Sequence, residues 1–153
     1  MSQRSIRFAA IGLNHSHIYG QTRCLLNAGA ELVAVHAIED DLADAYCKAF
    51  PQAKRVSDKR AILDDPKIHM IISASIPDER AATAMEAMRH GKDVMVDKPG
   101  VISLDQLAEL KKVQQDAKRI WSVCFSERFE TASTERASQL VAAGAIGKVV
   151  QTV

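Results

Sequence analysis

The 153-residue sequence predicts an α/β protein in which a doubly wound, mostly parallel β-sheet lies between two layers of helices. Short apolar segments alternate along the chain with longer segments whose apolar residues recur at helical spacing. The short segments are almost continuously apolar, which is typical of parallel strands that crossover helices cover on both faces. Because crossovers are right-handed, a chain of this order winds outward in both directions from the centre of the sheet.

Six short segments have the composition of buried strands. The first, IRFAAI, stops at Gly12, and the fourth, MIISAS, has the composition of a strand buried on both faces. The expected strands span residues 6–11, 31–36, 54–56, 70–75, 93–97 and 120–125.

A helix is expected after each strand. After the second strand, apolar side chains recur at i, i+3, i+4, i+7 and i+8, and Pro51 ends this pattern. Pro77 is placed to begin the fourth helix, and Ser103 with Gln106 forms a capping box for the fifth. The expected helices span residues 17–27, 42–50, a brief segment between Asp58 and Asp65, 77–90, 103–117 and 130–143.

Composition and charge limit the classes of function. Apolar residues make up 47% and charged residues 25% of the chain, as in a soluble globular protein, and the formal net charge is +1. This balance gives no electrostatic attraction for nucleic acid or for an anionic membrane, so we expect neither partner. The three cysteines are widely spaced, which favours reduced thiols in the cytoplasm over a disulfide framework.

Two loops have the position of a nucleotide site, because open α/β sheets bind ligands at the carboxyl edge of their strands. The first runs from Gly12 to His17 and has the length of a dinucleotide turn, but Asn14 and His17 stand where further glycines are usual. The amides that open the following helix still favour a pyrophosphate. In the second loop, Ala37 stands at the place of the usual ribose-binding carboxylate, and Glu39 is a substitute two residues further on. No Lys or Arg lies in this loop to bind a 2′-phosphate, so we expect NAD rather than NADP.

Two further groups at this edge carry side chains suited to chemistry. His15, His17 and His36 raise a metal site as an alternative, since imidazole is the commonest transition-metal ligand. No nearby Cys completes the set, and loop histidines are usually ordinary polar residues, so the sequence favours no metal. After the fifth strand, Lys98 precedes a proline and is well placed to meet a substrate, although a solvated turn lysine is the simpler interpretation.

The chain contains, in this order, the segments IRFAAIGLNHSHIYG, VMVDKPG, FSERF and AAGAIGKVV. Together they resemble the amino-terminal half of the glucose–fructose oxidoreductase and inositol dehydrogenase (Gfo/Idh/MocA) family, over essentially the whole chain. The most specific are Asp97-Lys98-Pro99, where the family has Glu-Lys-Pro, and Gly144-x-x-Gly147. The resemblance implies a Rossmann-type domain that binds NAD or NADP, in an oxidoreductase that acts on sugars, polyols and related hydroxy compounds.

The resemblance also implies roles for individual residues. Lys98 is implied to be the catalytic residue, beside the substrate hydroxyl and the nicotinamide. Besides the two missing glycines, Ile76 and Arg80 depart from the family, which often has Pro and His at these positions. The implied cofactor-binding residues are Gly12, Asn14, His15, His17, Ala37, Glu39, Ser73, Ala74, Ser75, Asp97, Pro99 and Arg128.

The same resemblance divides the chain after residue 143. Residues 1–143 are expected to form the dinucleotide-binding domain, and residues 144–153 to lead into a second domain that supplies most of the substrate pocket and the usual oligomer interface. We therefore expect residues 1–153 alone to be inactive and the segment after Gly144 to be disordered or packed against another copy. The alternative function is a non-catalytic module on the same fold that binds a nucleotide or another ligand, or that has a regulatory role.

Overall fold

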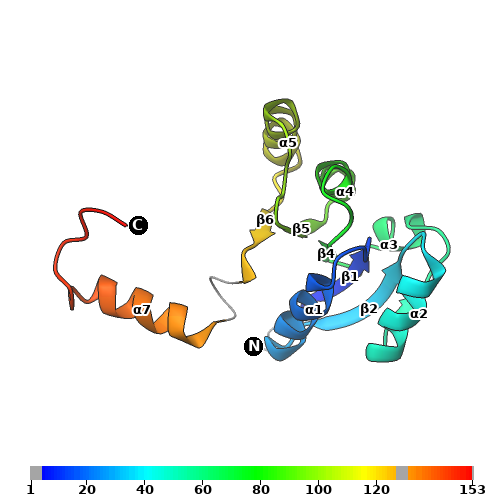
Figure 1. Cartoon of the computed structure of the whole chain (residues 1–153). Coiled ribbons are helices and arrows are strands. Elements are labelled where there is room, and N and C mark those ends of the chain that lie inside the picture. Colours follow the sequence, from blue (N-terminus) through cyan, green and yellow to red (C-terminus); the bar gives the residue numbers. More distant parts are fainter. Residues whose placement is uncertain (1–4, 127–130, 153) are drawn as a thin grey trace.

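The computed structural model describes residues 5–126 and 131–152. Its centre is a six-stranded parallel sheet in the order β3-β2-β1-β4-β5-β6 (Figure 1). The chain reverses its direction of winding between β1 and β4, and such switch points are where open α/β sheets bind ligands. The strands are β1 (Arg7–Ile11), β2 (Glu31–His36), β3 (Lys54–Arg55), β4 (Met70–Ser73), β5 (Asp93–Asp97) and β6 (Trp121–Cys124).

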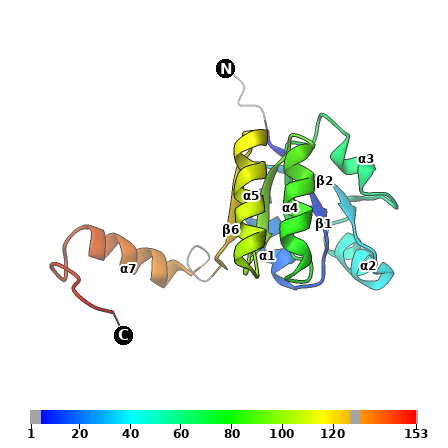
Figure 2. The ribbon, with the colours of Figure 1, turned by 90° about the horizontal axis from the view of Figure 1, so that it is seen from above.

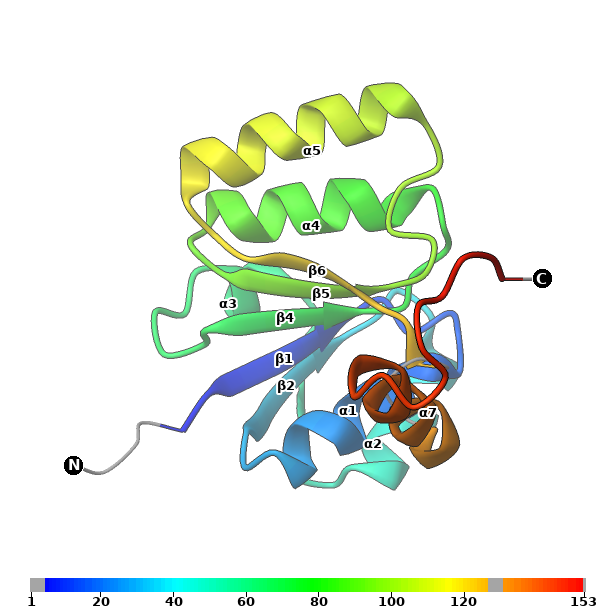
Figure 3. The same cartoon turned by 90° about the vertical axis from the view of Figure 1, so that its left-hand side faces the viewer.

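Helices cover both faces of the sheet, as the sequence predicts. α1 and α2 lie on one face, and α4 and α5 lie side by side on the other (Figure 3). This arrangement confirms the doubly wound, three-layer prediction. The helices are α1 (His17–Asn27), α2 (Asp40–Ala49), α3 (Arg60–Leu63), α4 (Glu79–Arg89), α5 (Leu104–Ala117) and α7 (Ala132–Ala142).

The central strand β1 supplies side chains to two separate cores. Successive side chains of a strand point to opposite faces of the sheet. Phe8 and Ala10 therefore pack with α1 and α2, where Tyr46 is fully buried, while Ala9 and Ile11 pack with α3, α4 and α5. Burial on both faces is the physical reason why the strands are nearly continuously apolar in sequence.

Two expected boundaries are wrong near the switch point. The fourth strand ends at Ser73 instead of residue 75, because the Ala74 amide leaves the sheet ladder and donates to the Gly12 carbonyl (3.1 Å). Helix α4 begins at Glu79, not at Pro77, which lies in the preceding turn. The capping box is confirmed on its serine side, since Ser103 Oγ accepts from the Gln106 amide at 3.1 Å.

Helix α7 stands away from the sheet (Figures 1 and 2), and none of its residues is buried. Residues 144–152 form neither helix nor strand and are exposed. Arg128, expected to contact the cofactor, lies outside the described residues. Across residues 5–126 and 131–152, no helix has the length and apolar character that crossing a membrane requires.

Candidate functional site

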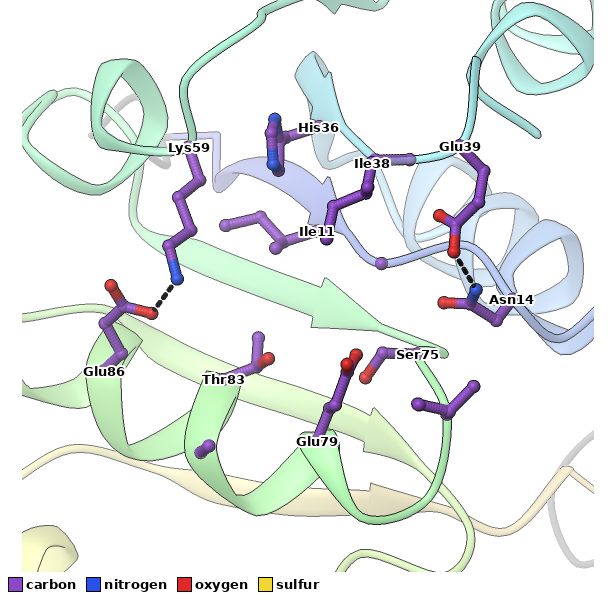
Figure 4. Close-up of a pocket in the computed structure, with 14 residues that line it drawn as sticks. Ile11, Asn14, His36, Ile38, Glu39, Lys59, Ser75, Glu79, Thr83 and Glu86 are labelled. Atoms are coloured by element: carbon purple, nitrogen blue, oxygen red, sulfur yellow. Dashed lines mark hydrogen bonds and ion pairs between the residues drawn. The ribbon is translucent and has the colours of Figure 1, made fainter. Parts of the chain in front are cut away.

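A cavity of about 300 Å³ opens at the carboxyl edge of the sheet, at the switch between β1 and β4 (Figure 4). Its walls come from the turn after β1, the loop after β2, the residues after β4 and one side of α4. The structure therefore forms a cavity at the edge where the sequence predicts a nucleotide. The predicted cofactor residues that line it are Gly12, Asn14, Ala37, Glu39 and Ser75.

The turn after β1 depends on glycine at its first position. Gly12 has φ +80°, and a Cβ there would lie only 2.6 Å from the Cβ of Ser75. The approach is close because the turn is tied to the end of β4, where the His15 amide donates to the Ala74 carbonyl at 2.9 Å. Ser73 and Ala74 are buried and do not line the cavity. They hold the turn in place from behind instead of forming a cofactor wall.

The amides of this turn are only partly free to bind an anion. The His17 amide, which the sequence predicts as a pyrophosphate ligand, donates to Nδ1 of His15 at 3.3 Å. The amide of Ile18 donates to the His15 carbonyl at 3.2 Å. Within the described part of the chain, the amides of Asn14 and Ser16 donate to no acceptor. The Leu13 amide likewise has no acceptor among the described residues, but Leu13 is buried, so the amides of Asn14 and Ser16 are the donors that the turn offers to a phosphate group.

The substitute carboxylate predicted in the second loop does reach the cavity. Glu39 Oε1 accepts a hydrogen bond from Nδ2 of Asn14 at 2.7 Å, so the first two loops meet above the end of β1 (Figure 4). Ala37, at the usual position of the ribose-binding acid, is buried. The carboxylate of the second loop, Glu39, therefore lies two residues after the usual position of the ribose-binding acid. It is held by Asn14, which stands where a further glycine is usual.

The structure also brings a lysine into the cavity that the sequence analysis missed. Lys59 precedes α3, and its Nζ donates to Oε2 of Glu86 on α4 at 2.6 Å (Figure 4). The loop after β3 also lies at the carboxyl edge of the sheet. The rule that open α/β sheets bind ligands at this edge was the signal that could have identified Lys59. Glu39 and Glu79 line the same cavity, so carboxylates outnumber this one lysine there.

A buried ion pair lies beneath the end of β5. Asp97 is 1% exposed and Arg80 is 2% exposed, and Nη2 of Arg80 lies 3.3 Å from Oδ2 of Asp97. Arg80 Nε donates to the Ser75 carbonyl at 2.7 Å, and its Nη1 donates to the carbonyl of Lys98. Burial lowers the pKa of the guanidinium, and the charge of Asp97 opposes this shift. Arg80, which departs from the family pattern, thus joins the end of β4 to the turn that carries Lys98.

The turn after β5 is fixed on both sides of Lys98. The Lys98-Pro99 peptide bond is cis. At Gly100 a Cβ would lie 2.5 Å from Val123 and 2.8 Å from Trp121, so the turn packs directly against β6. Lys98 is partly exposed and forms no ion pair with any described residue, but it does not line the cavity.

The three-histidine metal hypothesis is wrong in its third member. His36 Nδ1 lies 3.2 Å from the Val56 carbonyl, away from the other two histidines. His15 and His17 do come together, with ring centroids 4.1 Å apart. Both face Asp97: Nδ1 of His17 lies 2.9 Å from Oδ1, and Nδ1 of His15 lies 3.5 Å from Oδ2. The resemblance implies that Asp97 binds the cofactor, and no pattern in the sequence indicates its contact with the two histidines.

A glycine-dependent turn and a cavity at the switch point of a doubly wound parallel sheet define a nucleotide-binding domain of the Rossmann class. The chain belongs to the Gfo/Idh/MocA family, because the family profile described as "Oxidoreductase family, NAD-binding Rossmann fold" matches residues 6–125. The match covers the six strands of the sheet and helices α1 to α5.

Named relatives agree with this assignment. The chain is 26% identical over 149 residues to a scyllo-inositol 2-dehydrogenase (NAD(+)) of Bacillus subtilis, covering 97% of this chain and 43% of the relative. It is 27% identical over 110 residues to a levoglucosan dehydrogenase of Pseudarthrobacter phenanthrenivorans, covering 72% and 28%. A crystal structure from Erwinia carotovora atroseptica superposes with a TM-score of 0.93 at 36% identity, covering 96% of this chain and 44% of that one. The chain thus spans less than half the length of these relatives.

Proposed function

We propose that this chain is the cofactor-binding half of an NAD-dependent oxidoreductase that moves hydride between nicotinamide and a sugar, a polyol or a related hydroxy compound. The observation that carries the proposal is the cavity at the switch point, with Gly12 on one side and Glu39 on the other. The substrate class is supported by the relatives named as inositol and levoglucosan dehydrogenases. The substrate pocket and any oligomer contact belong, in this proposal, to residues beyond 143.

The charges around the cavity favour NAD over NADP in this proposal. A 2′-phosphate adds negative charge beside the adenosine ribose, where Glu39 and Glu79 already lie. Lys59 is the basic side chain in the lining, and Glu86 neutralises it. A free ribose hydroxyl instead donates well to a carboxylate such as Glu39.

We expect the chain to bind NADH more tightly than NADPH, and the Glu39→Ala variant to bind NADH about tenfold or more weakly, since a hydrogen bond to a charged group contributes ~1.5–3 kcal/mol. Fluorescence titration of the bound dihydronicotinamide measures both affinities. Glu109→Gln is the matched control, because Glu109 pairs with Arg89 away from the cavity. Tighter binding of NADPH by the unmodified chain contradicts the proposal, and binding of neither cofactor favours the non-catalytic module.

A second prediction tests the role of Lys59. The Glu86→Gln variant removes the partner of Lys59, so we expect its affinity for NADPH to rise about two- to fivefold relative to NADH, as for a partly exposed ion pair. The same titration measures this ratio. Adding Lys59→Met to Glu86→Gln is expected to abolish the gain. An equal change for both cofactors in Glu86→Gln would show that Lys59 does not meet the 2′-phosphate position.

A further inference from the structure

His15, His17 and Asp97 place three ligand atoms at one point on the carboxyl edge of the sheet. One nitrogen from each ring and one carboxylate oxygen all lie within 4.8 Å of one another. The two histidines come from the turn after β1, and Asp97 ends β5, which is separated from β1 by β4 in the sheet. The cluster therefore depends on the tertiary fold and not on a local sequence motif.

The separations suit a small divalent transition metal. With metal–ligand bonds of ~2.0–2.1 Å, tetrahedral ligands lie about 3.3 Å apart. Nδ1 of His17 lies 2.9 Å from Oδ1 of Asp97 and Nδ1 of His15 lies 3.5 Å from Oδ2, so each ring is close to that spacing from one of the two carboxylate oxygens. Nδ1 of His15 accepts a long hydrogen bond from the His17 amide (3.3 Å), which binding of a metal to this nitrogen would replace.

A second observation points to a ligand at the same place. Oδ2 of Asp97 is buried and accepts no hydrogen bond from any described residue. Nη2 of Arg80 lies 3.3 Å away without forming a hydrogen bond to it, while Nε and Nη1 donate to backbone carbonyls. A buried carboxylate oxygen without a donor is costly to leave unsatisfied. A cation bound between the rings satisfies it, and Arg80 then orients the carboxylate from behind, as outer-sphere partners of metal ligands do.

The exposure of the cluster leaves room for a further ligand. The side chain of His15 is 46% exposed and that of His17 is 29% exposed, whereas Asp97 lies at the base of the cluster. Three protein ligands with an open outward position are the arrangement of zinc sites that bind a water or another small ligand. Arg80 carries a positive charge next to Asp97, so the affinity is expected to be lower than at a site without that neighbour.

We propose that His15, His17 and Asp97 form a binding site for one divalent transition-metal ion of the zinc class, with an open coordination position toward solvent. These three residues do not line the nucleotide cavity. The proposal of a metal site does not depend on the proposed hydride transfer. The two histidines occupy the turn in which the sequence departs from the glycine-rich pattern. Of these two, His17 stands where a glycine is usual, so the departure supplies one of the proposed ligands.

The test uses the chain after removal of metal with a chelator, titrated with Co²⁺ and then with Zn²⁺ as competitor. We expect one Co²⁺ per chain, a ligand-field absorption band of a four- or five-coordinate ion without thiolate charge transfer, and displacement by Zn²⁺. His15→Ala and His17→Ala are each expected to weaken binding about tenfold or more, since even outer-sphere changes cost this much. Asp97→Asn, which keeps the shape of the buried side chain, is expected to do the same.

His36→Ala is the matched control, because His36 lies at the same edge of the sheet but faces Val56, and its Co²⁺ affinity is expected to be unchanged. Circular dichroism verifies that each variant is folded. Absence of the Co²⁺ band in the unmodified chain overturns the proposal. A thiolate band, or equal loss in the His36→Ala variant, overturns it as well. Because NADH titration of the metal-free chain is independent of these results, failure of the metal site leaves the proposed function standing.

Discussion

Replacing Arg80 with methionine is expected to lower the free energy of unfolding by about 3–5 kcal/mol, the usual cost of leaving one partner of a buried ion pair alone. Arg80 is 2% exposed, and its guanidinium donates to the carbonyls of Ser75, after β4, and Lys98, after β5. Its loss leaves Asp97 charged and buried, with His17 at 2.9 Å and His15 at 3.5 Å as its neighbours among the described residues. Chemical denaturation followed by circular dichroism measures this effect on the chain itself.

Two variants separate the buried ion pair from a general effect on α4. Arg89→Met, at an exposed position of the same helix, is expected to change the unfolding free energy by no more than about 0.5 kcal/mol. Adding Asp97→Asn to Arg80→Met removes the uncompensated charge, so the double variant is expected to be less destabilised than the sum of the single variants. An Arg80→Met effect no larger than that of Arg89→Met would show that the pair contributes little to stability.

Replacing Lys98 with alanine is expected to lower kcat by about 10²–10⁴-fold, the range of a positioned acid or base. The measurement needs a protein of the relatives' length that carries this sequence as its amino-terminal part, and residues 1–153 alone are expected to show no turnover. An ammonium beside the substrate hydroxyl stabilises the developing oxyanion as hydride leaves. Lys98 is free of ion pairs among the described residues and is held by Arg80 and a tightly packed turn, which suits that role.

The same variant has a distinct binding signature. Lys98 does not line the cavity, so NADH affinity is expected to stay unchanged in Lys98→Ala while kcat falls. Lys112→Ala on α5, a lysine distant from this edge, is the control and is expected to keep full activity. A Lys98→Ala variant with normal kcat would show that the proton is handled by another group.

The sequence predicted well what depends on neighbouring residues. Apolar runs and helical periodicity report local burial, and they located the six strands and the helices with small errors at their ends. The errors near Ser73 and Pro77 arise because Ala74 bonds to the turn after β1, a partner 62 residues earlier in the chain. Periodicity carries no information about such a partner.

The functional edge was predicted in position but not in its contacts. Gly12 and Glu39, which are predicted to contact the cofactor, line the cavity, because parallel strands bring their carboxyl ends to one edge. Ser73 and Ala74 were assigned to the cofactor, but they lie buried behind the turn. Lys59 was missed because the loop after the shortest strand carries no motif.

The sequence by itself determined the order of the elements, their parallel arrangement and the edge at which a ligand binds, since these follow from hydrophobic period and crossover handedness. Only the tertiary structure decided which side chains meet there. It paired His15 and His17 with Asp97 in place of His36, and it buried Arg80 between the ends of β4 and β5. His17 and Asp97 lie 80 positions apart in the sequence, so their contact is set by how the helices and the sheet pack. Packing depends on shape and charge summed over the whole core, which local patterns do not encode.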